Sequence, residues 1–169
     1  MANTYTLIAS STVGSGGAAS IDFTSIPATY TDLCLKVTAR DSSTSGPYGV
    51  LISFNGSASN FSGVFLEGNG ASASSGNLAR YIGTETPANY TASTFSNIEV
   101  YIPNYAGSNN KSFSADGVSE NNATTAYATL NAGLWSITTA INQITLYIGN
   151  GTPLFAQYST AYLYGISKS

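Results

Sequence analysis

The sequence predicts an all-β protein, an antiparallel β-sandwich or jelly roll of about eight to ten strands in a single domain spanning residues 1–169. Three observations support this prediction. Apolar and polar residues alternate along most of the chain, clusters of Gly, Ser, Asn and Pro interrupt the alternation regularly, and no segment repeats apolar residues at helical spacing. A chain of 169 residues is long enough to bury one core.

The clearest strands are LCLKVTAR, SNIEVYIP, NQITLYIG and STAYLYGI, and weaker ones are TYTLIAS, AASIDF, GVLISF, KSFSADGV and AYATLNAGLWS. We expect residues 1–20 to form an N-terminal arm or an edge hairpin that turns at the Gly-rich segment 13–17. The expected core consists of Leu35, Val37, Ile52, Phe54, Ile98, Val100, Ile102, Leu134, Trp135, Ile144, Leu146 and Ile148.

The stretch from Phe54 to Gly76, FNGSASNFSGVFLEGNGASASSG, resembles both a linker and a strand. Asn55-Gly56 is typical of a tight turn after the strand GVLISF. The middle of the stretch, FSGVFLEG, has too much apolar bulk for a free linker, which indicates a short strand that ends near Asn69-Gly70. The segment 71–76 is then an exposed loop, and we expect a partner to contact it first.

The low charge of the chain excludes several classes of function. Only 8% of residues are charged, against about 25% in ordinary soluble domains. The five basic residues are scattered, so we expect neither nucleic-acid binding nor binding to an anionic membrane. No apolar run reaches the length of a transmembrane helix and no cleavable signal peptide is evident, so we expect synthesis in a cytosol without export by a cleaved signal.

The residue types needed for most catalysis are missing. The chain has no histidine, which removes Ser-His-Asp and Cys-His triads and His-ligated zinc, and Cys34 has no partner for a disulfide. We therefore expect no enzyme activity, no catalytic residues, no metal and no cofactor. A glycan hydrolase remains a remote alternative, for which Glu67 and Glu85 are the candidate pair of carboxylates; the other interpretation is that each is a solvated charge at a strand end or in a loop.

Tyrosine is unusually abundant, with twelve residues in the chain. Tyr surrounded by Ser, Gly and Asn makes adaptable contact surfaces, although Tyr is also favoured in ordinary β-structure. The candidate partner contacts are Tyr48, Tyr81, Tyr90, Tyr101, Tyr105, Asn69, Ser72 and Ser74.

Four segments together resemble a group of small virion structural proteins of tailed bacteriophages, especially marine and cyanobacterial phages. They are IDFTSIPATYTDLCLKVTAR, ISFNGSASNFSGVFLEGNG, IEVYIPNYAGSNNKSFSADGVSENN and TAYLYGI, and they cover most of the chain in order. Cys34 and Lys36 depart from the plain alternation expected there. The resemblance implies a virion location and a jelly-roll module that either decorates a capsid or faces carbohydrate in a fibre.

Two functions are therefore open. The first is a capsid decoration, or cement, protein that binds the major capsid protein, or other virion proteins, on the outer head surface. The alternative is a receptor-binding module of a tail fibre or spike that contacts host surface glycans. Both predict a homo-oligomer, with a homotrimer favoured, because a charge-poor β-surface needs covering.

Overall fold

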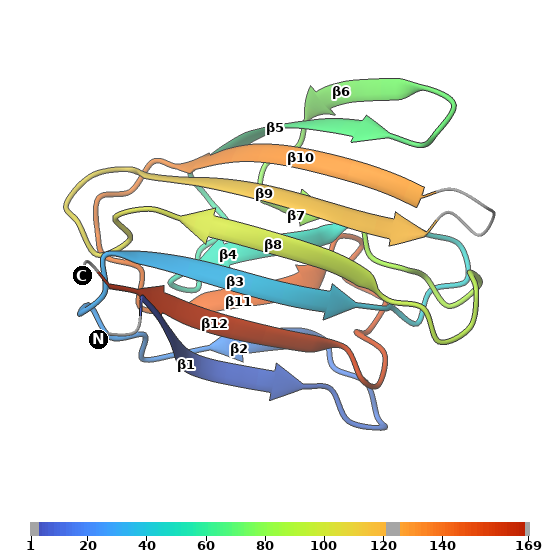
Figure 1. The fold of residues 1–169 in the computed structure, drawn as a ribbon, viewed down its shortest axis with the longest axis horizontal. Helices are drawn as coiled ribbons and strands as arrows, with labels where there is room; N and C mark the ends of the chain where they lie inside the picture. The colour runs from blue at the N-terminus through green and yellow to red at the C-terminus, as the bar shows by residue number, and fades with distance from the viewer. Residues whose placement is uncertain (1–3, 121–125, 168–169) are drawn as a thin grey trace.

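The structure is a computed structural model that describes residues 4–120 and 126–167 (Figure 1). The described residues form twelve β-strands in two antiparallel sheets, without helices. The strands are β1 (Tyr5–Thr12), β2 (Ser20–Phe23), β3 (Asp32–Ala39), β4 (Val50–Phe54), β5 (Phe61–Gly68), β6 (Ala73–Asn77), β7 (Tyr81–Gly83), β8 (Ser96–Ile102), β9 (Lys111–Glu120), β10 (Ala126–Trp135), β11 (Ile144–Ile148) and β12 (Thr160–Ile166). The predicted all-β sandwich is confirmed.

The order of the strands is that of a jelly roll. Strand β1 pairs with β12, β2 with β11, β3 with β8 and β4 with β7, so the chain forms one long ribbon of nested antiparallel pairs. Rolling this ribbon up gives two four-stranded layers, β1-β12-β3-β8 and β2-β11-β4-β7. Together with four inserted strands, they bring the described residues to twelve strands, two more than the upper end of the predicted eight to ten.

The other four strands are two hairpins inserted into the roll. The hairpin β5–β6 follows β4, and the hairpin β9–β10 follows β8. Strand β9 pairs with β8, β10 with β9, and β5 with β10, which extends one layer to eight strands in the order β1-β12-β3-β8-β9-β10-β5-β6. In Figure 1, β5 and β6 lie beyond β10 at the far edge of this large sheet.

The core lies between the large sheet and the four-stranded small sheet. Phe54 of β4 contacts the rings of Phe61, Phe113 and Trp135, with ring centroids 5.4 to 5.8 Å apart. Burying each such side chain contributes about 1.5–3 kcal/mol to the free energy of unfolding. All the predicted core residues are buried except Leu134, which is 37% exposed because it follows the strand alternation opposite to buried Trp135.

The N-terminal prediction was wrong in one respect. Strand β1 is an edge strand of the large sheet, whereas β2 belongs to the small sheet, so these two strands do not form the expected hairpin. Each of these strands finds its partner near the C-terminal end of the ribbon instead. The Gly-rich segment 13–17 crosses from one layer to the other, and Val13 N–H and Ala18 N–H donate to the carbonyls of Ser159 and Phe155.

The stretch 54–76 contains the predicted turn and one strand more than predicted. Asn55 and Gly56 have φ angles of 52° and 71°, as a tight hairpin turn requires. The side chain of Asn55 anchors a distant loop, since its Oδ1 accepts from the N–H of Asn142 and its Nδ2 donates to the carbonyl of Ala140. Residues 73–77, expected as loop, are strand β6, because β5 supplies backbone partners for them.

We predict that Gly133→Ala lowers the free energy of unfolding by about 1–3 kcal/mol or more, because a Cβ at this position would lie 2.0 Å from the ring of Phe113. Gly68→Ala is the matched control on β5, since a Cβ there meets nothing within 4 Å. Denaturant unfolding of both variants measures the difference. Equal stability of the two variants would contradict the packing described for β9 and β10.

Candidate functional site: the outer face of the large sheet

The strand β10 has its alternation inverted. Leu130, 60% exposed, and Leu134 point away from the core, whereas Thr129 and Asn131 point inward and are buried. The side-chain amide of Asn131 has no hydrogen-bond partner among the described residues. In a strand with one solvated face the apolar residues point inward, so the pattern of β10 indicates that its outer face is made for contact.

The strands on either side of β10 continue this surface. Val64 and Leu66 of β5 are 54% and 58% exposed, and Leu66 lies directly opposite Leu130 in the register. Val118 of β9 is also exposed. We call Val64, Leu66, Val118, Leu130 and Leu134 the aliphatic face. Five neighbouring aliphatic side chains on a surface otherwise poor in charge are typical of a protein–protein contact site.

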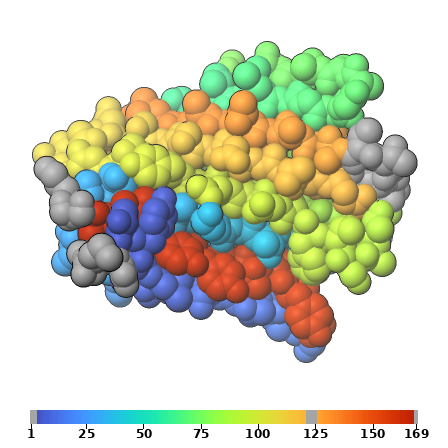
Figure 2. Space-filling view, in the orientation of Figure 1, coloured from blue at the N-terminus to red at the C-terminus, as the bar shows by residue number. Residues whose placement is uncertain are grey.

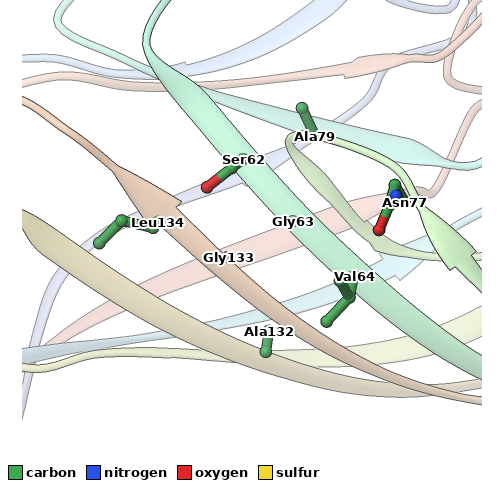
Figure 3. A pocket seen from close by; sticks show the side chains of 8 residues that line it. All are labelled: Ser62, Gly63, Val64, Asn77, Ala79, Ala132, Gly133 and Leu134. Carbon is green, nitrogen blue, oxygen red and sulfur yellow. The ribbon is translucent and has the colours of Figure 1, made fainter.

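Two hollows flank the ridge formed by Leu66 and Leu130. The first lies between Val64 and Leu134 and has a volume of about 490 Å³ (Figure 3). Its floor is the paired backbone of Gly63 and Gly133 together with the small side chains of Ser62 and Ala132.

The second hollow has the same volume, about 490 Å³. Its lining includes Leu66, Leu130 and Gly117, with the charged residues Asp116 and Glu67 and the hydroxyl residue Ser74 also contributing. The aliphatic face is therefore a ridge between two depressions, a relief that a partner surface can fit.

A short charged strip separates the aliphatic face from the other half of the sheet. Lys36 of β3 and Glu99 of β8 form a salt bridge with an N–O distance of 2.5 Å, and Asp116 of β9 lies next to Glu99 in the register. Beyond the strip, β1, β12 and β8 expose a group of mainly aromatic residues: Tyr5, Leu7, Tyr101 and Tyr162. Figure 2 looks onto this large sheet, with β5 and β6 standing out beyond β10.

The structure brings three of the predicted contact residues, Tyr48, Tyr81 and Ser74, to one small hollow, and leaves the others apart. Asn69, Ser72 and Ser74 lie at the tip and edge of the β5–β6 hairpin, where Asn69 Oδ1 accepts from the N–H groups of Ala71 and Ser72. Tyr101 is exposed on the outer face of β8, where its hydroxyl donates to Asp32.

Four further tyrosines were candidates, and two of them are corrected. Tyr81 is 7% exposed and Tyr105 is fully buried, with its hydroxyl donating to the carbonyl of Pro27, so neither forms an exposed contact. Tyr48 and Tyr90 are half-buried in loops. The sequence predicts exposure for these tyrosines because they fall on the polar face of a strand or in a loop. Tyr81 and Tyr105 are instead covered by other segments of the chain, which the alternation within one segment does not reveal.

The loop that carries Tyr48 is held by two buried carboxyl groups. Asp41 Oδ1 accepts from the N–H of Ser43 at 2.9 Å, and Glu85 Oε1 accepts from the N–H of Tyr48 at 2.7 Å. The second oxygen of each carboxyl group has no hydrogen-bond partner among the residues that the structure describes. Burial raises the pKa of both groups, that of Glu85 to about 7.

The Glu67 and Glu85 pair does not form an open catalytic cleft. Glu85 is fully buried, whereas Glu67 lines a surface hollow and accepts a hydrogen bond from Thr84.

Within residues 4–120 and 126–167 there is no group of three or more His, Cys, Asp and Glu side chains that could hold a metal ion. The same residues contain no helix long and apolar enough to cross a membrane.

Sequence reasoning missed the aliphatic face, although a signal for it exists. FSGVFLEG and AYATLNAGLW carry large apolar residues in both alternation registers, as strands covered on two faces do. No protein-family model matches the chain, and no curated protein matches it. The interpretation of the aliphatic face therefore depends on its own geometry.

We predict that the fold loses stability as the pH rises from about 4.5 to 7 and then levels off. The folded pKa of Glu85 lies above its ordinary value of 4.5, so the native state keeps a proton that the unfolded chain releases. The loss is on the order of 3–4 kcal/mol, because the pKa of Glu85 rises from 4.5 to about 7 and each pH unit between them corresponds to about 1.4 kcal/mol. Asp41, whose pKa is also raised, adds to the loss with the same sign.

Urea unfolding of Glu85→Gln across this pH range tests the prediction. The amide keeps an oxygen to accept from Tyr48 N–H, so the variant should show a flatter profile and higher stability than the unmutated protein at pH 8. Asp116→Asn, at an exposed position, is the control and should keep the original slope. A profile of Glu85→Gln that parallels the unmutated protein would contradict the assignment.

Proposed function

We propose that the protein is a structural component of a tailed-phage virion, a decoration protein that binds the outer surface of the capsid through its aliphatic face. The observation behind this proposal is the inverted alternation of β10, which exposes Leu130 and Leu134 while burying Asn131. Exposing these leucine side chains to water is unfavourable, and covering the outer face of β10 with another protein removes that unfavourable free energy.

The relief of the face specifies the chemistry of the partner. Apolar side chains of the capsid protein would enter the two hollows beside Leu66 and Leu130, and a basic side chain would face Asp116 at the border. We expect the interface between one copy and the capsid to be of ordinary size, which is about 800 Å² on each partner. Many copies on one shell then add up to a large total stabilisation through multivalency.

The fold and the resemblance support the same location. Jelly rolls build capsid and lectin domains, so the topology agrees with a role on a virion by analogy only. The aromatic group at the other end of the large sheet, with Tyr5, Leu7 and Tyr162, offers a second surface at which copies can meet. A homotrimer remains our prediction for the assembled state.

The double variant Leu66→Glu/Leu130→Glu should reduce binding to undecorated capsids at least about 100-fold, because two carboxylates would be buried against an apolar partner. Leu154→Glu is the matched control: Leu154 is 37% exposed and lies in the loop between β11 and β12, outside both exposed groups of the large sheet. Co-sedimentation of purified protein with shells measures the binding. Equal binding by the double variant and the unmutated protein would refute the assigned surface.

Location on the particle separates decoration from the fibre alternative. Immunogold labelling or a low-resolution map of intact virions should place the protein over the whole head surface. Labelling confined to the tail would overturn the decoration proposal and favour a receptor-binding module.

A further inference from the structure

A small hollow lies on the side of β5 opposite to the aliphatic face. Because strand residues alternate, Phe65 and Glu67 point into it while Val64 and Leu66 point outward. Its other walls come from β6, β7 and the loop between β3 and β4, through Ser74, Tyr81 and Tyr48. The hollow has a volume of about 260 Å³, and we call it the carboxylate hollow.

The polar groups of the carboxylate hollow form an oriented chain. The Tyr81 hydroxyl lies 2.6 Å from Thr84 Oγ1, which in turn donates to Glu67 Oε2 at 3.3 Å. With Thr84 donating to Glu67, the Tyr81 hydroxyl is left to donate to Thr84. Glu67 Oε1 accepts no hydrogen bond from any described residue, and the hydroxyl of Ser74 across the strand pair is exposed. The hollow therefore presents free acceptors beside aromatic rings.

The walls are rigid and aromatic. The rings of Phe65 and Tyr81 meet edge to face at a centroid distance of 5.6 Å. Glycine lets two of the surrounding strands come close, since a Cβ on Gly49 would lie 2.6 Å from the Tyr81 ring and one on Gly76 would lie 3.0 Å from the Phe65 ring. Tyr48 is fixed by the hydrogen bond of its N–H to buried Glu85 and by the contact of its hydroxyl with Ser45.

These features select a class of ligand. The hollow is below the usual 300–1,000 Å³ of drug-sized sites, which suits one small ring. Glu67 is the only charged group among the described residues that line it, so phosphates and acidic sugars are repelled. A carboxylate accepts from hydroxyl groups, and the C–H face of a pyranose packs on aromatic rings.

We propose that the carboxylate hollow binds a single uncharged hexopyranose, such as the terminal residue of a glycan, with sugar hydroxyls donating to Glu67 and the ring packed between Phe65 and Tyr48. This inference does not depend on the proposed capsid function, because Phe65 and Glu67 point to one side of β5 while Val64 and Leu66 point to the other. The carboxylate hollow and the second hollow of the aliphatic face meet at Glu67 and Ser74, which line both.

Saturation-transfer NMR and calorimetry with methyl glycosides of glucose, galactose, mannose and N-acetylglucosamine test the proposal on the full chain. At least one should bind saturably with a Kd on the order of 1 mM, which corresponds to about −4 kcal/mol. Glu67→Gln should raise that Kd about tenfold, because it removes a charge-assisted hydrogen bond. Methyl glucuronide, which is anionic, should bind more weakly than the neutral glycosides.

The hairpin supplies a matched pair of controls. Ser74→Trp fills the hollow and should abolish binding, whereas Ser75→Trp, which points to the other face of β6, should leave it unchanged. Circular dichroism and thermal melting confirm that both variants are folded. Saturable binding of the glycosides that survives Ser74→Trp, or no binding of any of them, would overturn the proposal.

An organic cation is the competing ligand class. Binding of butylammonium in place of the glycosides, sensitive to Glu67→Gln, would also overturn the proposal. The double variant Leu66→Glu/Leu130→Glu, at residues that do not line the carboxylate hollow, should keep glycoside binding, so a failure of capsid binding and a failure of glycoside binding are distinguishable.

Discussion

The pairing of β5 with β10 is the interaction on which the rest of this structure depends. The two strands come from insertions about 60 residues apart, and they match over eight positions from Ala128 opposite Gly68 to Trp135 opposite Phe61. An isolated two-stranded hairpin is only marginally stable in water. Joined to each other and to β8, the two hairpins become a four-stranded extension that carries the large sheet past its neighbour.

This extension explains why both candidate sites lie where they do. Strand β7 of the small sheet packs against the inner faces of β9 and β10, where Phe113 and Trp135 are buried, while the outer faces of the added strands are open. On one side they expose the aliphatic face, and on the other they enclose the carboxylate hollow with help from β7 and the loop of Tyr48. The roll itself supplies stability, while the insertions supply the surfaces.

The sequence predicted the fold class and most of the core because local alternation reports burial when one face of a strand is solvated. Ile98, Val100 and Ile102 illustrate this, since they lie on one face of β8 and are fully buried. The same reasoning failed for Leu134, where the apolar face of β10 points outward, and for Tyr105, which is buried by a segment remote in sequence. The nested pairing could not be predicted from the alternation within each segment either, because it joins strands at opposite ends of the chain.

The nested pairing has a consequence for how the chain acquires its structure. Tyr5 of β1 pairs with Ile166 of β12, so the first strand has no partner until almost the whole chain has been synthesised. Folds dominated by such distant contacts form slowly, because closing each long loop loses chain entropy before the new contacts stabilise the structure. The inserted hairpins are local and can form first, with Leu66 and Leu130 already uncovered. A net charge of −3 gives little electrostatic repulsion between chains at that stage, so we expect the partly folded chain to be prone to aggregation.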